Sequence, residues 1–562
     1  MTDSAATERP IGLVTRSSVY ANRYRDSVAL MRIAASALKI EGVERAALVM
    51  ATEANLADAK AQGFPVDFTD LKKPPTANDV FVALSGSQLA CTNALELIQR
   101  ELEPTARREA GGPFGPTTEP PRSLVAALRA VQTEPSPTAT SAATESTPTE
   151  SAPVADERMP KPIAIVSVPA AFAASEARKA IRLGMHVLLF SDNVSLPDEV
   201  ELKLLARERG VLLMGPDCGT AMFDGVPLGF VNAVRRGPVA VIGASGTGMQ
   251  EVMTEIHYLG SGVSQAIGCG GRDLHANVGA STMSQAIGMI NADPSTEALV
   301  LVSKPPDPLV LQRVIDATRP LIARGVPVVL AFTGLDPSVI AGTGLVVASS
   351  LADAAARAVG ALKTTMRTYE PASFATESVS VALTGSMASA EPHVSPSRGD
   401  SGNAERIVGA FVGGTLCAEF RYLLRNLPST SIVACTDFGD DAYTRGRPHP
   451  MIDPELRDKA VARALADPDV GIVHFDVVLG FGASPEPISQ LRVILASRPD
   501  ATRPILSAHV LGTELDEQGY AEIVRNLEEL GVHVSRTNAN AAAFVEKMAR
   551  QSVPSAEPGV QR

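Results

Sequence analysis

The sequence predicts an α/β protein with several domains built on parallel sheets. Residues 162–362 and 406–548 contain short, nearly continuous apolar runs, many of them rich in β-branched residues, and helical patterns separate most of these runs. Buried parallel strands that alternate with covering helices produce this pattern. The chain has 562 residues, enough for about three or four domains of ~100–200 residues each.

The expected elements alternate along the chain. Three blocks carry the patterns, at about 13–107, 162–362 and 406–548. The first block is expected to form strands at 46–50 and 79–84 and helices at 24–39 and 90–102. The second gives strands at 163–168, 187–190, 211–214, 239–242, 298–302 and 328–332, with helices at 174–183, 199–207 and 281–291. The third gives strands at 407–412, 432–435, 470–475, 505–508 and 532–534, with helices at 454–465, 520–530 and 541–548.

Two segments interrupt these patterns and divide the chain. Both are rich in Pro, Ser and other small or polar residues and cannot bury enough apolar surface to fold. The expected division is a small N-terminal α/β domain (1–107), a Pro/Ser/Thr-rich linker (108–160), two α/β segments (161–236 and 237–362), a second linker (363–404) and a C-terminal α/β domain (405–552).

The composition favours a soluble, cytoplasmic protein. A net charge of -12 argues against general nucleic-acid binding, which requires a basic face. The chain has neither an N-terminal apolar signal core nor a run of about eighteen apolar residues, so we expect no membrane span. Its five cysteines are odd in number and lack CxxC spacing, which favours reduced thiols and predicts no metal site.

A glycine-rich turn follows the expected strand at 239–242. A helical run begins directly after it, so the first helical turn carries no bulky side chain. Unpaired N–H groups at such a helix start bind phosphate, an acyl phosphate or a carboxylate, although a tight turn explains the same glycines equally well. The expected anion-binding residues here are Gly243, Ser245, Gly246, Thr247 and Gly248.

Three further groups lie at or near expected strand ends, where parallel sheets place their ligands. Each has a structural alternative, which for Cys218 is small-residue packing and for Arg272 and Asp273 is a turn pair. The expected substrate-pocket residues are Gly215, Pro216, Asp217, Cys218, Gly270, Gly271, Arg272, Asp273 and Lys304.

The polar loop DFGDDAYTRGRPHP gives the candidate catalytic residues Arg445, Arg447 and His449. Arginine binds a carboxylate or phosphate through two parallel hydrogen bonds, and a histidine transfers protons. A surface loop with internal Asp–Arg pairs and a packed histidine is the alternative. The segment Gly413–Gly414–Thr415 is either a further anion-binding turn or a plain helix start.

The motifs MGPDCGT (214–220), GASGTGMQE (243–251) and GCGGRDL (268–274) resemble the α subunit of succinyl-CoA synthetase. The third block is similar to the C-terminal ligase domain of the β subunit. The resemblance implies a Rossmann-like CoA-binding domain (161–236) and flavodoxin-like α-type (237–362) and β-type (405–552) ligase domains. It also implies an anion pocket between two facing helix starts, with Gly439, Asp440 and Asp441 at the second.

The chain is identified as a member of the FdrA family on blocks such as GGRDL, LVSKPP, GGTL and GRPHPMIDP, which cover most of its folded part. Family members are labelled acyl-CoA synthetases and are implicated as a subunit of oxamate carbamoyltransferase in allantoin breakdown. This membership implies a hetero-oligomer whose ligands are phosphate, carbamoyl phosphate and oxamate.

The synthetase relay requires a histidine in the loop at 332–346, yet no histidine occurs between His275 and His393. The chain also has no room for an ATP-grasp domain, and CoA is the only cofactor that the resemblance still allows. The leading hypothesis is therefore a transferase subunit that converts oxalurate and phosphate to oxamate and carbamoyl phosphate. The alternatives are an acyl-CoA synthetase component and a non-catalytic binding or scaffold subunit.

Overall fold

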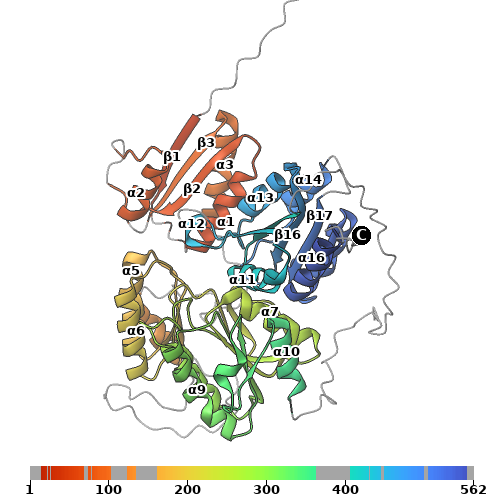
Figure 1. Cartoon of the computed structure of the whole chain (residues 1–562). Coiled ribbons are helices and arrows are strands. Elements are labelled where there is room, and N and C mark those ends of the chain that lie inside the picture. Colours follow the sequence, from red (N-terminus) through yellow and green to blue (C-terminus); the bar gives the residue numbers. More distant parts are fainter. Residues whose placement is uncertain are drawn as a thin grey trace, which may run out of the picture. The chain divides into compact units, whose positions relative to one another are not determined.

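The computed structural model describes residues 14–21, 23, 25, 27–68, 74–76, 79–102, 123–133, 161–362, 405–429, 431–444, 448–498 and 504–552 (Figure 1). The chain divides into two compact units. One contains residues up to Cys218 together with Asp441–Asp453, and the other contains Gly219–Asp440 together with Pro454–Arg562. The expected linker at 363–404 lies outside the described residues.

The first unit begins with a three-stranded antiparallel sheet of order β1-β3-β2. Alternate residues of the central strand β3 point to opposite faces, and its Val82 and Leu84 belong to the core covered by α1 and α3. The elements are β1 (Val14–Tyr20), α1 (Ser27–Leu38), β2 (Val43–Met50), α2 (Glu53–Ala61), β3 (Val80–Gly86) and α3 (Gln88–Leu102).

The same unit contains a three-stranded parallel sheet of order β4-β5-β6. Leu124 of a preceding helix, α4, packs against the core of this sheet. The expected linker at 108–160 therefore includes a helix, which the Pro/Ser/Thr-rich composition around it concealed. The elements are α4 (Leu124–Thr133), β4 (Ile163–Val166), α5 (Ala170–Arg182), β5 (His186–Leu189), α6 (Leu196–Glu208) and β6 (Leu213–Met214), with α12 (Asp441–Thr444) also in this unit.

The second unit begins with a seven-stranded sheet of order β13-β12-β11-β9-β10-β7-β8. Its β9–β13 strands pair in parallel, whereas β7 and β8 form an antiparallel edge. Because β7 pairs with β10, residues from Gly219 onward belong to this sheet, and the division lies after Cys218 rather than after residue 236. The strands are β7 (Thr220–Phe223), β8 (Val226–Gly229), β9 (Arg236–Gly243), β10 (Val263–Gly268), β11 (Ala298–Ser303), β12 (Val328–Phe332) and β13 (Val346–Val347).

Three α-helices and a short 3₁₀ helix lie between these strands in the chain, and a further α-helix, α10, follows the last strand. They are α7 (Gly246–Tyr258), α8 (Ser281–Ala292), α9 (Pro308–Ala323), η1 (Pro337–Ile340) and α10 (Leu351–Gly360).

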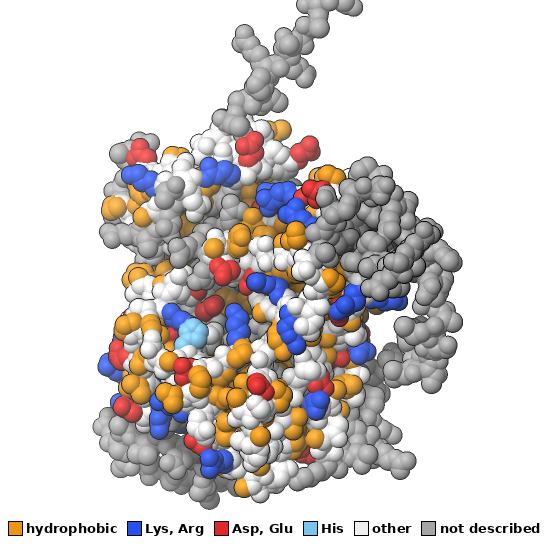
Figure 2. Space-filling view, viewed as in Figure 1, with side chains coloured by type: hydrophobic (Ala, Val, Ile, Leu, Met, Phe, Trp, Pro, Cys, Tyr) orange, Lys and Arg blue, Asp and Glu red, His pale blue; other side chains and the backbone are white. Residues whose placement is uncertain are grey.

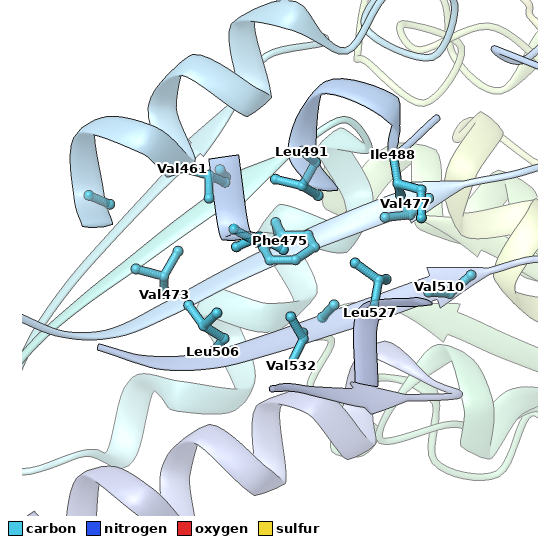
Figure 3. Packing of buried hydrophobic residues seen from close by; sticks show 14 of the residues in the cluster. Val461, Val473, Phe475, Val477, Ile488, Leu491, Leu506, Val510, Leu527 and Val532 are labelled. Carbon is cyan, nitrogen blue, oxygen red and sulfur yellow. The ribbon is translucent and has the colours of Figure 1, made fainter. Parts of the chain in front are cut away.

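The C-terminal part of the second unit is a five-stranded parallel sheet of order β15-β14-β16-β17-β18. Phe475 lies at the centre of the core on one face, surrounded by aliphatic side chains such as Leu491 and Leu527 (Figure 3). The elements are β14 (Glu405–Phe411), α11 (Gly414–Leu423), η2 (Leu424–Asn426), β15 (Ser431–Asp437), α13 (Glu455–Ala466), β16 (Val470–Val478), α14 (Ser489–Ala496), β17 (Ile505–Leu511), α15 (Tyr520–Glu529), β18 (Val532–Ser535) and α16 (Asn538–Ser552).

The parallel sheets with helices between their strands confirm the predicted α/β class. No helix among the described residues is long and apolar enough to cross a membrane. Acidic and basic side chains are interspersed on the face of the molecule shown in Figure 2.

Candidate functional site

The start of α7 is built by small residues at the carboxyl end of β9. Ser245 caps the helix, because its Oγ accepts a hydrogen bond from the Gly248 N–H at 3.0 Å. A Cβ at Gly243 would lie 2.6 Å from Met249 Cγ, so only glycine lets the helix pack this closely on its strand. Gly246 is exposed and Thr247 half-buried, so solvent reaches this helix start.

The start of α11 is held by a side chain from another strand. Gly413 occupies the capping position and offers no side chain. The carboxylate of Asp476, on β16, accepts hydrogen bonds from Val412 N–H at 2.6 Å and from Gly413 N–H at 2.9 Å. Asp476 is fully buried, so the turn that begins α11 is fixed by the register of two neighbouring strands.

The two helix starts meet. Ser245 Oγ lies 2.5 Å from Thr415 Oγ1, and α7 and α11 lie side by side (Figure 1). Glycines permit this approach, because a Cβ at Gly248 would lie 2.9 Å from Thr415 Cγ2 and a Cβ at Gly413 would lie 3.0 Å from Thr247 Cβ. Two macrodipoles therefore end at one place, with two hydroxyl groups between them.

The partner of α7 differs from the one expected from the resemblance. The expected second start was at Gly439–Asp441, but the helix that follows, α12, has only four residues, and Asp441 belongs to the first unit. The start of α11, at Gly413–Thr415, makes the contact instead. Gly439 and Asp440 follow β15, the strand beside β14, and Gly439 N–H donates to Asp437 Oδ1 at 2.9 Å.

Lys304 brings a positive charge to this region from the end of β11. Burial raises the pKa of the Asp437 carboxyl, and the charge of Lys304 acts in the opposite direction. A Cβ at Gly414 would collide with Asp437 Oδ2, so this carboxylate lies directly against the start of α11. Lys304 itself is exposed.

A buried polar network joins the two helices below their starts. Glu251 of α7 lies 2.7 Å through its Oε2 from His509 Nε2, and its Oε1 accepts from the Asn538 N–H at 3.0 Å. The other ring nitrogen of His509 lies 3.2 Å from the Ser535 carbonyl oxygen, which only accepts hydrogen bonds. His509 therefore shares a proton with Glu251. Burial lowers the pKa of His509, but the charge of Glu251 and the hydrogen bonds to Glu251 and Ser535 together outweigh it, so the pKa is raised.

Glu419 of α11 completes this network. It accepts hydrogen bonds from the Leu351 N–H and from Asn538 Nδ2, both at 2.7 Å. Burial raises the pKa of Glu419 to about 7, and the charge of Glu251 adds to this effect. Burial likewise raises the pKa of Asp476 to about 6, although the hydrogen bonds from the two backbone N–H groups act to lower it.

The turn at Gly215–Cys218 lies in the first unit. Asp217 N–H donates to the Ser191 carbonyl at 3.1 Å, and Cys218 N–H donates to that of Leu189 at 3.3 Å. Gly215 has a φ of 110°, which favours glycine, and the Gly215–Pro216 peptide bond is cis. These N–H groups fold the turn back onto β5, which agrees with the packing alternative for Cys218.

The GGRDL segment follows β10. Asp273 is fully buried and accepts hydrogen bonds from Thr282 N–H at 3.0 Å and Met283 N–H at 2.9 Å. Asp273 thus caps the start of α8, which is a structural role. Gly270 has a φ of 84° and Gly271 has open space around it, while Arg272 is half-buried.

The predicted catalytic residues Arg445 and Arg447 lie outside the described residues. His449 lies in the first unit, and its Nδ1 accepts a hydrogen bond from Met451 N–H at 3.2 Å. Burial lowers the pKa of His449 to about 4, so its ring is neutral at pH 7. A neutral ring can accept a proton but is a weak match for an acid–base catalyst near neutral pH.

Sequence reasoning missed the buried network, although a signal was present. The strand VGIVHFDVV (470–478) and the strand ILSAHVL (505–511) are apolar except for a few polar and titratable residues. Asp476 and His509 are direct partners in the β16–β17 register. A titratable residue inside an otherwise apolar buried strand requires a partner, and this requirement marks a structural or functional site.

Two family models match the chain. The family described as "AllF, heavy metal-associated domain" matches residues 13–118, and the family described as "CoA-ligase" matches residues 410–548. Within the part of the chain that the structure describes, no group of three or more His, Cys, Asp or Glu residues is arranged to hold a metal ion.

The uncharacterized protein YahF of Escherichia coli strain K12 is 34% identical over 544 residues, which cover 92% of this chain and 95% of YahF. The α subunit of the ADP-forming succinate–CoA ligase of Aquifex aeolicus is 28% identical over 146 residues, 25% of this chain. The chain spans 47% of that subunit. The apo form of acetyl-coenzyme A synthetase 1 of Ca. Korarchaeum cryptofilum is 15% identical in sequence, and its structure matches this one with a TM-score of 0.32. The match covers 71% of this chain and 86% of the synthetase chain.

Proposed function

The chain belongs to the same protein family as YahF of Escherichia coli, and we propose that it is an acyl-transfer enzyme of the CoA-ligase type. In this proposal the starts of α7 and α11 bind the phosphoryl group of an acyl phosphate. The observation that carries it is the contact between Ser245 and Thr415, which brings two helix starts together within the second unit.

These residues act on the phosphoryl group through preorganised charge. The first four N–H groups of each helix have no acceptor within the helix, and the macrodipoles favour an anion there. The hydroxyls of Ser245 and Thr415 bond to each other, so one of them donates within the pair and the other adds one O–H donor that is already fixed in position. Lys304 adds a positive charge at the neighbouring strand end. Fixed donors of this kind stabilise the charge that develops as an acyl–phosphate bond forms or breaks.

CoA is the cofactor expected of a CoA ligase, and it would supply the thiol acceptor of the acyl group. The turn at Gly215–Cys218 does not fit the phosphates of CoA, because the N–H groups of Asp217 and Cys218 donate to protein carbonyls.

The first candidate reaction is acyl-CoA formation, with this chain as one component of an acyl-CoA synthetase. The CoA-ligase match over residues 410–548 and the succinate–CoA ligase relative support it. A partner subunit would then bind the nucleotide and carry phosphate to the paired helix starts.

The second candidate is carbamoyl transfer, in which oxalurate and phosphate give oxamate and carbamoyl phosphate within a hetero-oligomer. A specific observation favours it, because the loop at 332–346 has no histidine to carry phosphate. Phosphate attack on a ureido carbonyl requires positioning and N–H donors but no phosphohistidine. The resemblance to the FdrA family supports the same candidate.

One experiment separates the candidates. Tagged intact chain would be purified with its bound partners and given carbamoyl phosphate with and without oxamate, and in parallel CoA, ATP and succinate. CoA thioester formation supports the ligase, and oxamate-dependent phosphate release supports the transferase. Neither product, with partners bound, would favour the non-catalytic scaffold.

Variants then test the site. The double substitution S245A/T415A removes both hydroxyls and is expected to lower kcat/KM by roughly 10- to 100-fold, since the pair has one O–H free to donate and a hydrogen bond to a charged group contributes about 1.5–3 kcal/mol. S489A changes an exposed serine on α14 and serves as the matched control. An unchanged kcat/KM in the double variant would place the phosphoryl site elsewhere.

A further inference from the structure

Two cysteines from different elements meet in the CoA-ligase domain. Cys417 lies on α11 and Cys435 on β15, and α11 packs against this strand. The two side chains form a hydrogen bond with each other, and neither is in a disulfide. The sequence conceals the pair, because no CxxC spacing links them.

The neighbouring strand makes room for the Cys435 sulfur. Gly409 of β14 is the direct register partner of Cys435. A Cβ at Gly409 would lie 2.7 Å from Cys435 Sγ, so only glycine allows the sulfur to occupy this position. The backbone N–H of Gly409 also donates a hydrogen bond to this sulfur.

The surroundings change the pKa values of the two thiols in opposite directions. The hydrogen bond from Cys417 is the main cause that lowers the pKa of Cys435, and the charge of Arg421 and the Gly409 N–H act in the same direction. The pKa of Cys417 is raised by its hydrogen bond with Cys435 and by burial. Cys435 is thus the sulfur that ionises first, while Cys417 keeps its proton.

The two thiols also differ in their exposure to solvent. Cys435 is partly exposed and lies on β15, which is the edge strand of the five-stranded sheet. Cys91, Cys218, Cys269 and Cys417 are buried. A partly exposed thiol with a lowered pKa beside a second thiol is the arrangement found in cysteines that react with peroxides and then form a disulfide.

We propose that Cys435 and Cys417 are an oxidation site, at which a hydroperoxide converts the two thiols to a disulfide. The Cys435 thiolate attacks one peroxide oxygen, so that an S–O bond forms, the O–O bond breaks and the leaving oxygen takes a proton to depart as water or an alcohol. Cys417 sulfur then attacks Cys435 sulfur, so that the S–S bond forms, the S–O bond breaks and a water leaves with the Cys417 proton. Two thiols are oxidised and one peroxide is reduced.

The disulfide would join α11 to β15 beside the helix start described above. Cys417 follows Thr415 by two residues, and Cys435 precedes Asp437, whose carboxylate lies against Gly414. The oxidation site stands on the thiol pair alone and does not depend on the proposed function.

The test uses the intact wild-type chain and hydrogen peroxide. After graded exposure, remaining thiols are alkylated and the digest is analysed by mass spectrometry. The expected result is a Cys417–Cys435 disulfide, with Cys435 consumed at least about tenfold faster than the buried cysteines. Oxidation of Cys435 no faster than Cys91, Cys218 or Cys269 would overturn the proposal, as would a disulfide between other partners.

Variants identify the roles of the two sulfurs. In C417S the sulfenic acid on Cys435 is expected to persist and to be trapped by dimedone, whereas C435S is expected to form no disulfide. C269S, which removes a fully buried cysteine, is the matched control and is expected to behave as wild type. Because the decisive rate is measured on the wild-type chain, a variant that fails to fold does not decide the outcome.

Discussion

The starts of α7 and α11 lie together but are built in opposite ways. The start of α7 is held by a residue next to it in the sequence, since Ser245 caps the helix that it precedes. The start of α11 is held by a residue far away in the sequence, since its glycine cap has no side chain and Asp476 of β16 accepts hydrogen bonds from the two N–H groups before the helix. One helix start is thus formed within residues 245–248, and the other depends on two strands pairing in the correct register.

This difference predicts unequal sensitivity to substitution. Removing a local cap costs one hydrogen bond that water can replace at a half-exposed site. Removing Asp476 leaves two buried N–H groups without acceptors, and such groups cannot turn to solvent. The start of α11 is therefore expected to be the more fragile of the two, and the following substitutions test the comparison.

The largest effect is expected from D476A. Each buried N–H left without an acceptor costs about 1–3 kcal/mol, so we expect the free energy of unfolding to fall by about 4 kcal/mol. Urea denaturation of the intact chain measures this loss. D469A removes an exposed carboxylate in the loop before β16 and is expected to change stability by less than about 0.5 kcal/mol. A loss below about 1 kcal/mol in D476A would contradict the tertiary role of Asp476.

The second effect concerns Glu419, which links α11 to the network around Glu251 of α7. Its pKa is raised from 4.5 to about 7, so the folded chain holds this proton more tightly than the unfolded chain. The stabilising contribution of the protonated carboxyl is complete below pH 4.5 and is lost as the pH rises through about 7. At 1.36 kcal/mol for each pKa unit, the loss approaches about 3 kcal/mol.

The variant E419Q removes this titration. The stability of wild type relative to E419Q is therefore expected to fall as the pH rises from 4.5 to 8, as measured by urea denaturation at each pH. E529Q, an exposed position on α15, controls for the loss of a carboxylate. Parallel pH profiles for wild type and E419Q would show that Glu419 is not the titrating group.

The sequence predicted the α/β class and most strands of the second unit, because buried parallel strands are apolar along their whole length. It also predicted the start of α7, because strand, small residues and helix follow one another in the chain. It left the start of α11, at Gly413–Thr415, only as a possible anion-binding turn, because the contact of this start with α7 depends on which strands are neighbours. The capping role of Asp273 was hidden for a related reason, since its acceptor atoms serve a helix that begins after a long loop.

A third substitution tests the close approach of the helices. A Cβ at Gly248 would lie 2.7 Å from Ser245 Oγ and 2.9 Å from Thr415 Cγ2, so G248A must push the two helix starts apart. We expect a loss of about 2 kcal/mol, as is typical of overpacking. Gly288 is also inside a helix but has open space around it, so G288A is expected to stabilise by up to about 1 kcal/mol. Equal effects of both changes in thermal unfolding would mean that the helix starts are loosely packed.

The smallest effect is expected at Ser245 itself. Loss of a serine cap should cost about 1 kcal/mol, and S350A, which removes the cap at the start of α10, measures this cost alone. Ser245 differs from Ser350 by its hydrogen bond to Thr415, so the loss of stability in S245A should exceed the loss in S350A by roughly 0.5–1 kcal/mol. In a T415A background this excess should vanish, because the partner hydroxyl is gone. An excess that persists in T415A would mean that the two helix starts do not interact through these hydroxyls, and the pairing would then rest on the buried network below them.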